Sequence, residues 1–391
     1  MDIERPLPLL GGLSPAGFMR RHWQKKPLLV RGALADALPG LDRQRLFALA
    51  AEDGVESRLV VNEADRWTVR PGPIPRRALP PLARAGWTLL VQGVDLHDDT
   101  AHRLLARFRF VPDARLDDLM LSYASDRGGV GPHIDSYDVF LLQIQGRRRW
   151  RIGRAALPRL RDDVPLKMLA GFVASQECLL EAGDMLYLPP GWGHDGVAVG
   201  PCVTASVGFR APAAAALAAE TLQRLGEAAL DALGEDEATG PKRDALYTDR
   251  GQAATERPAR IPASLQGFAD AALERVLGDA RARRRAVGEV LSEPKPGTWF
   301  ERSAPADASP VDGVVLDRRT RMLYDDVHVF INGESYRTSG RDAKLMRALA
   351  DRRWLRAAAT QQFGAAAKEL LARWAEAGWC TFGADESRRN S

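Results

Sequence analysis

Two strand-like segments far apart in the sequence carry polar residues that can act together only if the fold brings them side by side. The first presents His133 and Asp135 after a glycine-proline pair, and the second, Met185–Leu188, ends in a proline-glycine turn just before His194. Alternate residues of an extended strand share a face, so one strand can present both His133 and Asp135. His194 lies 61 positions after His133, which leaves room for several intervening strands. We therefore expect a small β-barrel, with His194 just past a buried strand at the barrel mouth.

These three residues are the types that one kind of metal site requires. Two imidazoles and one carboxylate can occupy one face of an octahedral metal and leave the other face open, as in non-haem Fe(II) oxygenases. An H-x-D pair by itself also arises by chance, so its context decides. Of the six histidines, His133 and His194 lie in glycine- and proline-bounded turns beside strand-like runs, whereas His97 and His102 lie in a polar connection. The context favours a catalytic iron site.

The sequence after this motif predicts a β-hairpin whose second strand buries an arginine. Residues 139–145 form a strand-like run, Gly146 marks a tight turn, and residues 148–152 form the returning strand. With a period of two, Arg148 lies on the inner, apolar face with Trp150. A buried guanidinium needs an anion beside it, either a dicarboxylate cosubstrate or an Asp or Glu of the protein, and the pattern favours neither. The outer face then receives Arg147, Arg149 and Arg151.

Several stretches within residues 1–212 share the pattern of one protein family. They are residues 22–30, 117–123, 128–140, 146–150, 183–194 and 206–212. In these stretches the chain resembles the Jumonji-C (JmjC) Fe(II)- and 2-oxoglutarate-dependent oxygenases. Within that superfamily it resembles the bacterial ribosomal oxygenases, which hydroxylate an arginine of a large-subunit ribosomal protein. The resemblance implies an α+β chain built on a double-stranded β-helix, which is a cupin-like barrel.

The resemblance also implies roles for individual residues. His133, Asp135 and His194 would ligate Fe(II), and Arg148 would bind the distal carboxylate of 2-oxoglutarate, where many JmjC proteins use a lysine. Ser122 corresponds to a hydroxyl contact to the same cosubstrate, although a strand serine is commonly a plain cross-strand hydrogen bonder. The third reactant is O₂, and the oxidising chemistry belongs to the cofactor while the protein positions and shields the reactants.

The implied function is hydroxylation of an arginine side chain of a ribosomal protein. Histidine hydroxylation and lysine demethylation are alternatives within the enzyme class. A non-catalytic cupin-like binding protein, whose winged helix recruits DNA or RNA, is the alternative from another class. The complete set of three ligands together with Arg148 argues against it, because a binding module has no need for an open iron face.

Composition and charge limit the partners. The 391 residues carry 55 basic and 51 acidic side chains, and this near balance does not demand nucleic acid, so direct nucleic-acid binding is not expected. The chain has no apolar stretch of membrane-spanning length and no signal-peptide pattern at its start. Three widely spaced cysteines favour a reducing compartment, and we expect a cytoplasmic protein. The acids near the motif form no long run and are interpreted as solvated: Asp113, Asp117, Asp118 and Asp126.

The C-terminal half has a different composition from the barrel. Apolar residues at helical spacing in residues 213–233 and 265–277 predict an amphipathic helical pair, which in the resembled family forms a homodimer and otherwise packs within the chain. The remainder predicts a strand at 327–331, a hairpin turn at Asn332-Gly333, helices at 341–355 and 365–377, and a closing strand at 379–382. This order is compatible with a winged helix. The predicted domains are a JmjC oxygenase domain (1–212), a helical dimerisation region (213–297) and a winged-helix-like domain (298–391).

Overall fold

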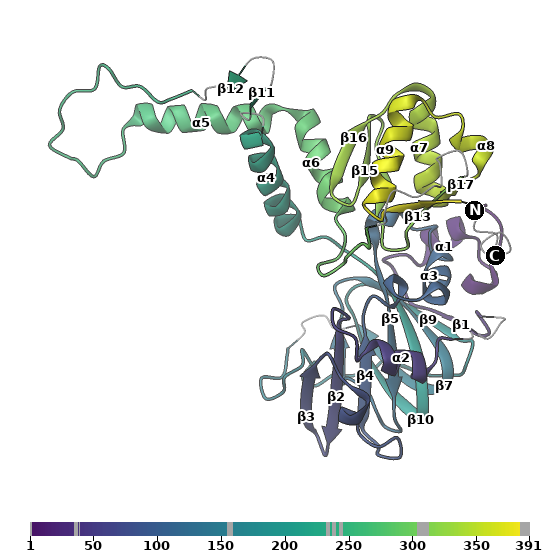
Figure 1. Cartoon of the computed structure of the whole chain (residues 1–391). Coiled ribbons are helices and arrows are strands. Elements are labelled where there is room, and N and C mark those ends of the chain that lie inside the picture. Colours follow the sequence, from purple (N-terminus) through teal and green to yellow (C-terminus); the bar gives the residue numbers. More distant parts are fainter. Residues whose placement is uncertain are drawn as a thin grey trace. The chain divides into compact units, whose positions relative to one another are not determined.

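In the computed structural model the chain divides into two compact units, Met1–Ala211 and Pro212–Ser391 (Figure 1). The structure describes residues 2–34, 38, 40–154, 159–231, 235–236, 240–241, 245–302 and 313–383. Each unit has a hydrophobic core of its own. None of the helices in these ranges combines the length and the apolar character needed to cross a membrane. The finer division into residues 1–212, 213–297 and 298–391 stays a prediction.

The first unit is built around a ten-stranded sheet whose paired strands all run antiparallel. The strands follow the order β1-β9-β7-β10-β5-β4-β2-β3, while β6 pairs with β10 and β8 pairs with β7. The strand bounds are β1 Leu28–Val30, β2 Ser57–Glu63, β3 Arg66–Pro71, β4 Trp87–Val91, β5 Leu116–Ala124, β6 His133–Ile134, β7 Asp138–Arg154, β8 Gln176–Leu180, β9 Met185–Leu188 and β10 Trp192–Phe209.

β7 and β10 are the longest described strands, with 17 and 18 residues, and they pair along almost their whole length. The hairpin predicted at Gly146 is therefore wrong, because β7 continues through this residue and its pairing with β10 resumes on both sides. Gly146 has a φ of +68°, and a Cβ there would lie 2.3 Å from the carbonyl oxygen of Pro201. The glycine lets the strand bend without reversing the chain, since residues 148–152 find their partners in β8 and β10.

The face assignment within this strand is nevertheless confirmed. Arg148 and Trp150 are buried, with exposed fractions of 4% and 5%. The arginines between and beside them are exposed: Arg147, Arg149 and Arg151. Side-chain alternation depends only on local extended backbone, so it survives the wrong assignment of the turn.

Three α-helices of the first unit contribute apolar side chains to the same core as the sheet. They are α1 Pro15–Arg21, α2 Arg43–Leu49 and α3 Asp99–Ala106. Ser14, Asp42 and Asp98 cap them, each side chain accepting hydrogen bonds from backbone amides of the first turn. Phe18 of α1 packs edge-on against Tyr187 of β9, with ring centroids 4.9 Å apart. Four short 3-10 helices lie at η1 Pro8–Leu10, η2 Arg76–Ala78, η3 Val94–Leu96 and η4 Asp113–Arg115.

The second unit begins with α4 (Ala214–Asp231), α5 (Ala263–Gly278) and α6 (Ala280–Ser292). The sequence predicted a helical pair, but the structure has a third helix, which begins directly after α5 at Asp279. The backbone of Asp279 is extended, and its carboxylate accepts hydrogen bonds from the amides of Arg281 and Ala282, which begins α6. A short strand pair, β11 (Glu235–Asp236) and β12 (Gly240–Pro241), lies between α4 and α5.

Two three-stranded sheets and three helices complete this unit. The turn predicted at Asn332-Gly333 is confirmed, with φ values of +49° and +89°. The helix predicted at 341–355 ends earlier, at Arg352, because Arg353 is left-handed (φ +65°) and Leu355 belongs to a sheet. The bounds are β13 Val314–Leu316, β14 Met322–Tyr324, β15 His328–Ile331, β16 Glu334–Arg337, α7 Gly340–Arg352, β17 Trp354–Leu355, α8 Ala357–Thr360, α9 Ala365–Glu376 and β18 Cys380–Phe382.

Candidate metal centre

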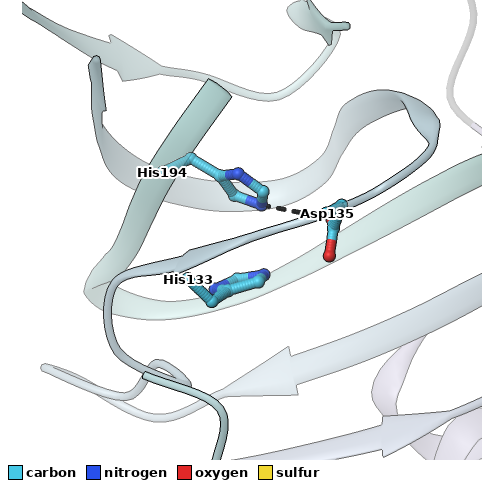
Figure 2. A group of neighbouring side chains, drawn as sticks. All are labelled: His133, Asp135 and His194. Carbon is cyan, nitrogen blue, oxygen red and sulfur yellow. Dashed lines mark ion pairs between the residues drawn. The ribbon is translucent and has the colours of Figure 1, made fainter. Parts of the chain in front are cut away.

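The three predicted ligands converge on one point of the first unit (Figure 2). His133 of β6 and His194 of β10 are direct cross-strand partners, and their ring centroids lie 4.2 Å apart. Asp135 follows the end of β6, and its Oδ2 lies 3.5 Å from Nε2 of His194. One potential ligand atom from each residue lies within 4.8 Å of the other two. The structure thus brings the predicted set together.

Two details of this placement differ from the sequence-based expectation. β6 contains only His133 and Ile134, so strand alternation alone does not place Asp135 beside His133, and the turn after β6 contributes. His194 lies inside β10 and not just past the end of a strand. β10 begins at Trp192, directly after the proline-glycine turn, because this segment finds partners in both β6 and β7.

Backbone carbonyls hold both imidazole rings. Nδ1 of His133 lies 3.0 Å from the carbonyl oxygen of Gly131, and Nδ1 of His194 lies 3.1 Å from that of Trp192. When Nδ1–H donates to a carbonyl, Nε2 keeps its lone pair, which is the atom that a metal ion binds. The donor set is therefore two imidazole nitrogens and one carboxylate, which fits Fe(II) in a facial arrangement.

Burial shifts the proton affinities of this site. It lowers the pKa of His194 well below its ordinary value, helped by the charges of His133 and Arg148. Burial also raises the pKa of Asp135, against the opposing effect of His133. A divalent cation favours the neutral imidazole and the ionised carboxylate, the forms in which both groups act as ligands.

Arg148 points to the same side of the sheet as His194. It is the cross-strand partner of Ala198, which shares one face of β10 with His194 because the two are four residues apart. The ring of Trp150 lies near both, with its centroid 5.2 Å from the guanidinium carbon of Arg148 and 5.9 Å from the ring centroid of His194. The two-stranded ribbon formed by β7 and β10 therefore places the Arg148 guanidinium and the metal ligand His194 on the same face of the sheet.

No described carboxylate forms an ion pair with the Arg148 guanidinium. Its Nη1 lies 3.2 Å from Ser122 Oγ and 3.2 Å from Thr204 Oγ1, and its Nε has no hydrogen-bond partner in the described part of the chain. Burial lowers the pKa of this guanidinium, which nevertheless stays charged at neutral pH. Of the two anions that the sequence left open, the protein carboxylate does not appear among the described residues. The surroundings suit an external carboxylate bound through a fork of N–H donors.

Sequence reasoning found Ser122 but missed Thr204. Thr204 is 1% exposed, lies opposite Ser122 in the pairing of β10 with β5, and donates its hydroxyl to Gln143 Oε1 at 3.1 Å. A threonine within an apolar run was the only sequence signal for it. Its meeting with Arg148 depends on a pairing between strands more than fifty residues apart in the chain.

An acidic and aromatic group lies next to Asp135. Tyr137 is 37% exposed, and burial of its hydroxyl raises its pKa together with the charges of Asp135, Asp118 and Asp117. A Cβ on Gly208 would lie within 4.0 Å of Tyr137, Asp117 and Asp118, so these side chains surround one point of β10. The interpretation of Asp118 as solvated is wrong, because it is 5% exposed and accepts a hydrogen bond from the Gly93 amide.

Comparisons with known proteins agree with this geometry. A JmjC domain model matches residues 103–217, and a ROXA-like winged helix model matches residues 270–381. The ribosomal protein uL16 3-hydroxylase of Escherichia coli (strain K12) is 41% identical over 196 residues, which are 50% of this chain and 52% of that protein. A probable ribosomal oxygenase of Haemophilus influenzae is 35% identical over 205 residues, 51% of this chain and 50% of that protein. The chain thus matches about half the length of these curated relatives.

Solved structures match over more of the chain. The structure of YcfD, a ribosomal oxygenase from Escherichia coli, in complex with cobalt and 2-oxoglutarate has a TM-score of 0.74 and 30% identity, covering 95% of this chain and 99% of that one. An X-ray structure of E. coli ycfD has a TM-score of 0.79 and 28% identity. The predicted cupin-like JmjC domain, helical region and winged helix are confirmed. The chain belongs to the JmjC-domain proteins that carry a ROXA-like winged helix.

Proposed function

We propose that the chain is an Fe(II)- and 2-oxoglutarate-dependent hydroxylase that acts on an arginine side chain of a large-subunit ribosomal protein. The observation that carries the proposal is the His133, Asp135 and His194 set beside a buried Arg148 that pairs with no carboxylate among the described residues. Its similarity to a ribosomal protein uL16 3-hydroxylase and to a ribosomal oxygenase bound to cobalt and 2-oxoglutarate supports the same activity.

Each residue has a distinct part in this function. His133, Asp135 and His194 would hold the iron, and Arg148, assisted by the hydroxyls of Ser122 and Thr204, would bind the distal carboxylate of 2-oxoglutarate. The bound iron supplies oxidation by O₂, in which the cosubstrate becomes succinate and CO₂ and one oxygen atom enters a C–H bond of the substrate. The residues of this chain fix the cosubstrate at both ends and exclude water from a largely buried site.

The surroundings of Tyr137, with Asp117 and Asp118, support the proposal that the substrate side chain is cationic. The partly exposed ring of Tyr137 offers a face on which a guanidinium can stack. Asp117 pairs with Arg210 and Asp118 accepts a hydrogen bond from the Gly93 amide, so the two carboxylates contribute negative charge beside the ring. Histidine hydroxylation stays an alternative, since a bifunctional lysine-specific demethylase and histidyl-hydroxylase NO66 of Drosophila persimilis is 24% identical over 201 residues. The lower identity favours the arginine assignment.

The homodimer also belongs to this proposal. α4 and α5 expose an unusual number of large apolar side chains, and covering them with a second copy would remove that surface from water. A ribosomal protein as substrate favours a cytoplasmic location. The exposed side chains are Leu222, Leu230, Leu265, Phe268, Leu273 and Leu277, with exposed fractions between 37% and 70%.

Anaerobic titration tests the metal and cosubstrate site. Adding Fe(II) and 2-oxoglutarate to the full chain should produce a visible charge-transfer absorption band. His194→Ala should lose the band, whereas the control His328→Ala, at a strand residue of the second unit, should keep it. Absence of the band with wild-type protein would contradict the oxygenase assignment.

Mass spectrometry tests the substrate. Ribosomal proteins from cells that contain the gene should differ from those of deletion cells by one oxygen atom on one arginine-containing peptide. The same peptide should be modified by the purified wild-type chain but not by Asp135→Ala. A modified histidine in place of an arginine would select the alternative, and no modified protein would overturn the ribosomal assignment.

A further inference from the structure

The end of α7, strand β17 and helix α8 come together in the winged-helix part of the chain (Figure 1). Their side chains line a cavity. Its volume is about 260 Å³. Leu355 and Ala359 supply apolar wall, while Trp354 and the polar side chains of Arg352, Arg356 and Gln362 complete it. The lining contains no acidic residue. It belongs to the second unit, whereas the three metal ligands and Arg148 belong to the first.

The positive charge of this cavity is not neutralised by the described part of the protein. Arg352 and Arg356 are exposed, and no carboxylate lies within ion-pair distance of either in that part of the chain. Arg353 behaves differently, since its guanidinium donates to the backbone carbonyls of Asp317 and Thr320 and so has a structural role. The two lining arginines are therefore available to bind an anion.

The chain segment around the cavity is also positively charged. Between positions 340 and 362 the sequence has six arginines and lysines and two aspartates. Both aspartates are engaged locally, because Asp342 accepts a hydrogen bond from the Gly364 amide and Asp351 accepts one from the Tyr324 hydroxyl. The whole chain has a net charge of only +4, so this short segment is far more basic than the average.

The cavity also offers an aromatic surface. Trp354 is 41% exposed, and no described arginine stacks on its ring, in contrast to Trp299, which Arg319 covers. Gln362 donates its amide to the Ala358 carbonyl, and its side-chain oxygen stays free to accept a hydrogen bond. An aromatic plane, two guanidinium forks and an amide acceptor match the parts of a nucleotide: a planar base and an anionic phosphate.

Cations on α7 continue the positive charge away from the cavity. Arg341, Lys344 and Arg352 are all exposed, and their spacing of three and eight residues places them within about 80° of one another around the helix axis. Arg352 follows Arg341 by eleven positions, which corresponds to about 16 Å along α7. A free nucleotide would fill the cavity alone, whereas a strand could also contact the other two cations.

We propose that this cavity binds one nucleotide of a single-stranded nucleic acid, with its base against Trp354 and its phosphate on Arg352 and Arg356. The chain of phosphates continues along Arg341 and Lys344. A base inside a duplex is already stacked and cannot reach Trp354, so the site discriminates against double strands. The expectation that the chain does not bind nucleic acid rested on net charge, which does not report a local segment. This inference does not depend on the proposed hydroxylase activity.

Fluorescence anisotropy with the full chain and a fluorescein-labelled single-stranded RNA of twelve nucleotides tests the proposal. Trp354→Ala should weaken binding about tenfold, the loss of one base-aromatic stack. The Arg352→Gln/Arg356→Gln double variant should weaken it and reduce the slope of log affinity against log salt by about 0.7, the contribution of the one phosphate that the two arginines share. Arg337→Gln removes an exposed arginine of β16 that does not line the cavity, and it should leave affinity within about twofold of wild type.

Competition separates the possible ligands. Unlabelled single strand should displace the probe, whereas AMP, inorganic phosphate and a duplex of the same sequence should do so only at far higher concentration. If AMP competed as well as the strand, the cavity would be a mononucleotide site and the proposal would be overturned. Equal weakening by Arg337→Gln, or no binding of the RNA by wild type at low salt, would overturn it as well. Thermal melting of each variant confirms folding, which substitution of these exposed side chains should not disturb.

Discussion

Replacing Arg148 by methionine should make the protein without cosubstrate more stable and make it bind 2-oxoglutarate poorly. The guanidinium is 4% exposed, and no described carboxylate pairs with it. Its two hydroxyl partners keep other hydrogen bonds after the substitution, because Ser122 donates to the Thr204 carbonyl and Thr204 donates to Gln143. The variant therefore removes a buried charge without leaving unsatisfied hydroxyl donors.

The substitution should have two effects of opposite sign, one on folding stability and one on cosubstrate binding. An apolar residue of similar volume in place of a buried ionic group is neutral or stabilising by about 1–4 kcal/mol. Removing the charged partner of the bound carboxylate costs about 2–5 kcal/mol of binding free energy. At 1.4 kcal/mol per factor of ten, the second value corresponds to an affinity about 30-fold to several thousandfold lower. Stability and binding thus change in opposite directions.

Denaturant unfolding with and without 2-oxoglutarate, in the presence of Mn²⁺, measures both effects. At a concentration one hundred times its dissociation constant, the cosubstrate should stabilise the wild type by about 2.7 kcal/mol. At that concentration a hundredfold weaker variant should gain only about 0.4 kcal/mol. Arg149→Met, at the exposed neighbour that pairs with Glu177, should change either quantity by less than about 1 kcal/mol. A less stable Arg148→Met protein that 2-oxoglutarate stabilises as much as wild type would refute the reasoning.

Three further substitutions test other parts of the first unit. Asp135→Ala should abolish tight Mn²⁺ binding in calorimetry. Gly131→Ala should destabilise by about 1–3 kcal/mol in urea unfolding, because its φ is +76° and a Cβ would lie 2.3 Å from Met168 Cε; adding Met168→Ala should remove only the steric part. Burial would raise the pKa of Asp184, but two backbone amides and Arg31 hydrogen-bond the carboxylate and hold its pKa below the ordinary 3.8. Because the pKa is lower in the folded protein, the ionised carboxylate stabilises the fold above pH 3.8, and this contribution is lost as pH falls through the folded pKa. Asp184→Asn should therefore cost about 1–3 kcal/mol at pH 7, and its difference from wild type should begin to shrink near pH 3.8 and close only at lower pH.

Each of these has a matched control. His328→Ala should retain Mn²⁺ binding, and unchanged binding by Asp135→Ala would argue against the metal centre. Gly171→Ala has a φ of +64° with no neighbouring atom within 4 Å, so it measures the backbone penalty alone. A Gly131→Ala loss no larger than that of Gly171→Ala would rule out the Met168 contact as a cause. Asp162→Asn, at an exposed aspartate, should stay within about 0.5 kcal/mol of wild type at both pH values; a gap for Asp184→Asn that persisted at low pH would contradict the carboxylate's role.

Local periodicity predicted much of the site. The alternation that buried Arg148 depends only on neighbouring residues in one strand, and it held although the turn at Gly146 was wrong. Glycine and proline residues, whose effect is also local, marked the segments that carry His133 and His194, although His194 lies inside β10 and not past a strand end. Gly146 itself was misassigned because a glycine with positive φ serves a turn and a bend equally well, and only the partner strand decides between them.

The features that sequence missed depend on contacts between distant segments. Thr204 joins Arg148 only through the pairing of β10 with both β7 and β5. Asp118 is buried because the Gly93 amide, 25 residues away, binds its carboxylate. Asp279 carries an ordinary capping signal, but the apolar spacing stopped at residue 277, so nothing in the pattern predicted that α6 follows α5. Periodicity predicts which face a residue occupies, whereas pairing determines what it meets there.

The ribbon of β7 and β10 also bears on which acids the site can select. Backbone hydrogen bonds between β7 and β10 fix the positions of His194 and Arg148. The distance between the metal site and the guanidinium is therefore fixed, and it sets the length of the cosubstrate that can bind both. A shift of one residue in the pairing register of β7 and β10 would turn Arg148 to the opposite face of the sheet. The smallest register shift that keeps Arg148 on the inner face is two residues, about 6.6 Å. One methylene changes a dicarboxylate by much less than this. The backbone therefore cannot adjust to a dicarboxylic acid that is one carbon longer or shorter than the cosubstrate. Only the side-chain rotamers can determine which of these acids binds.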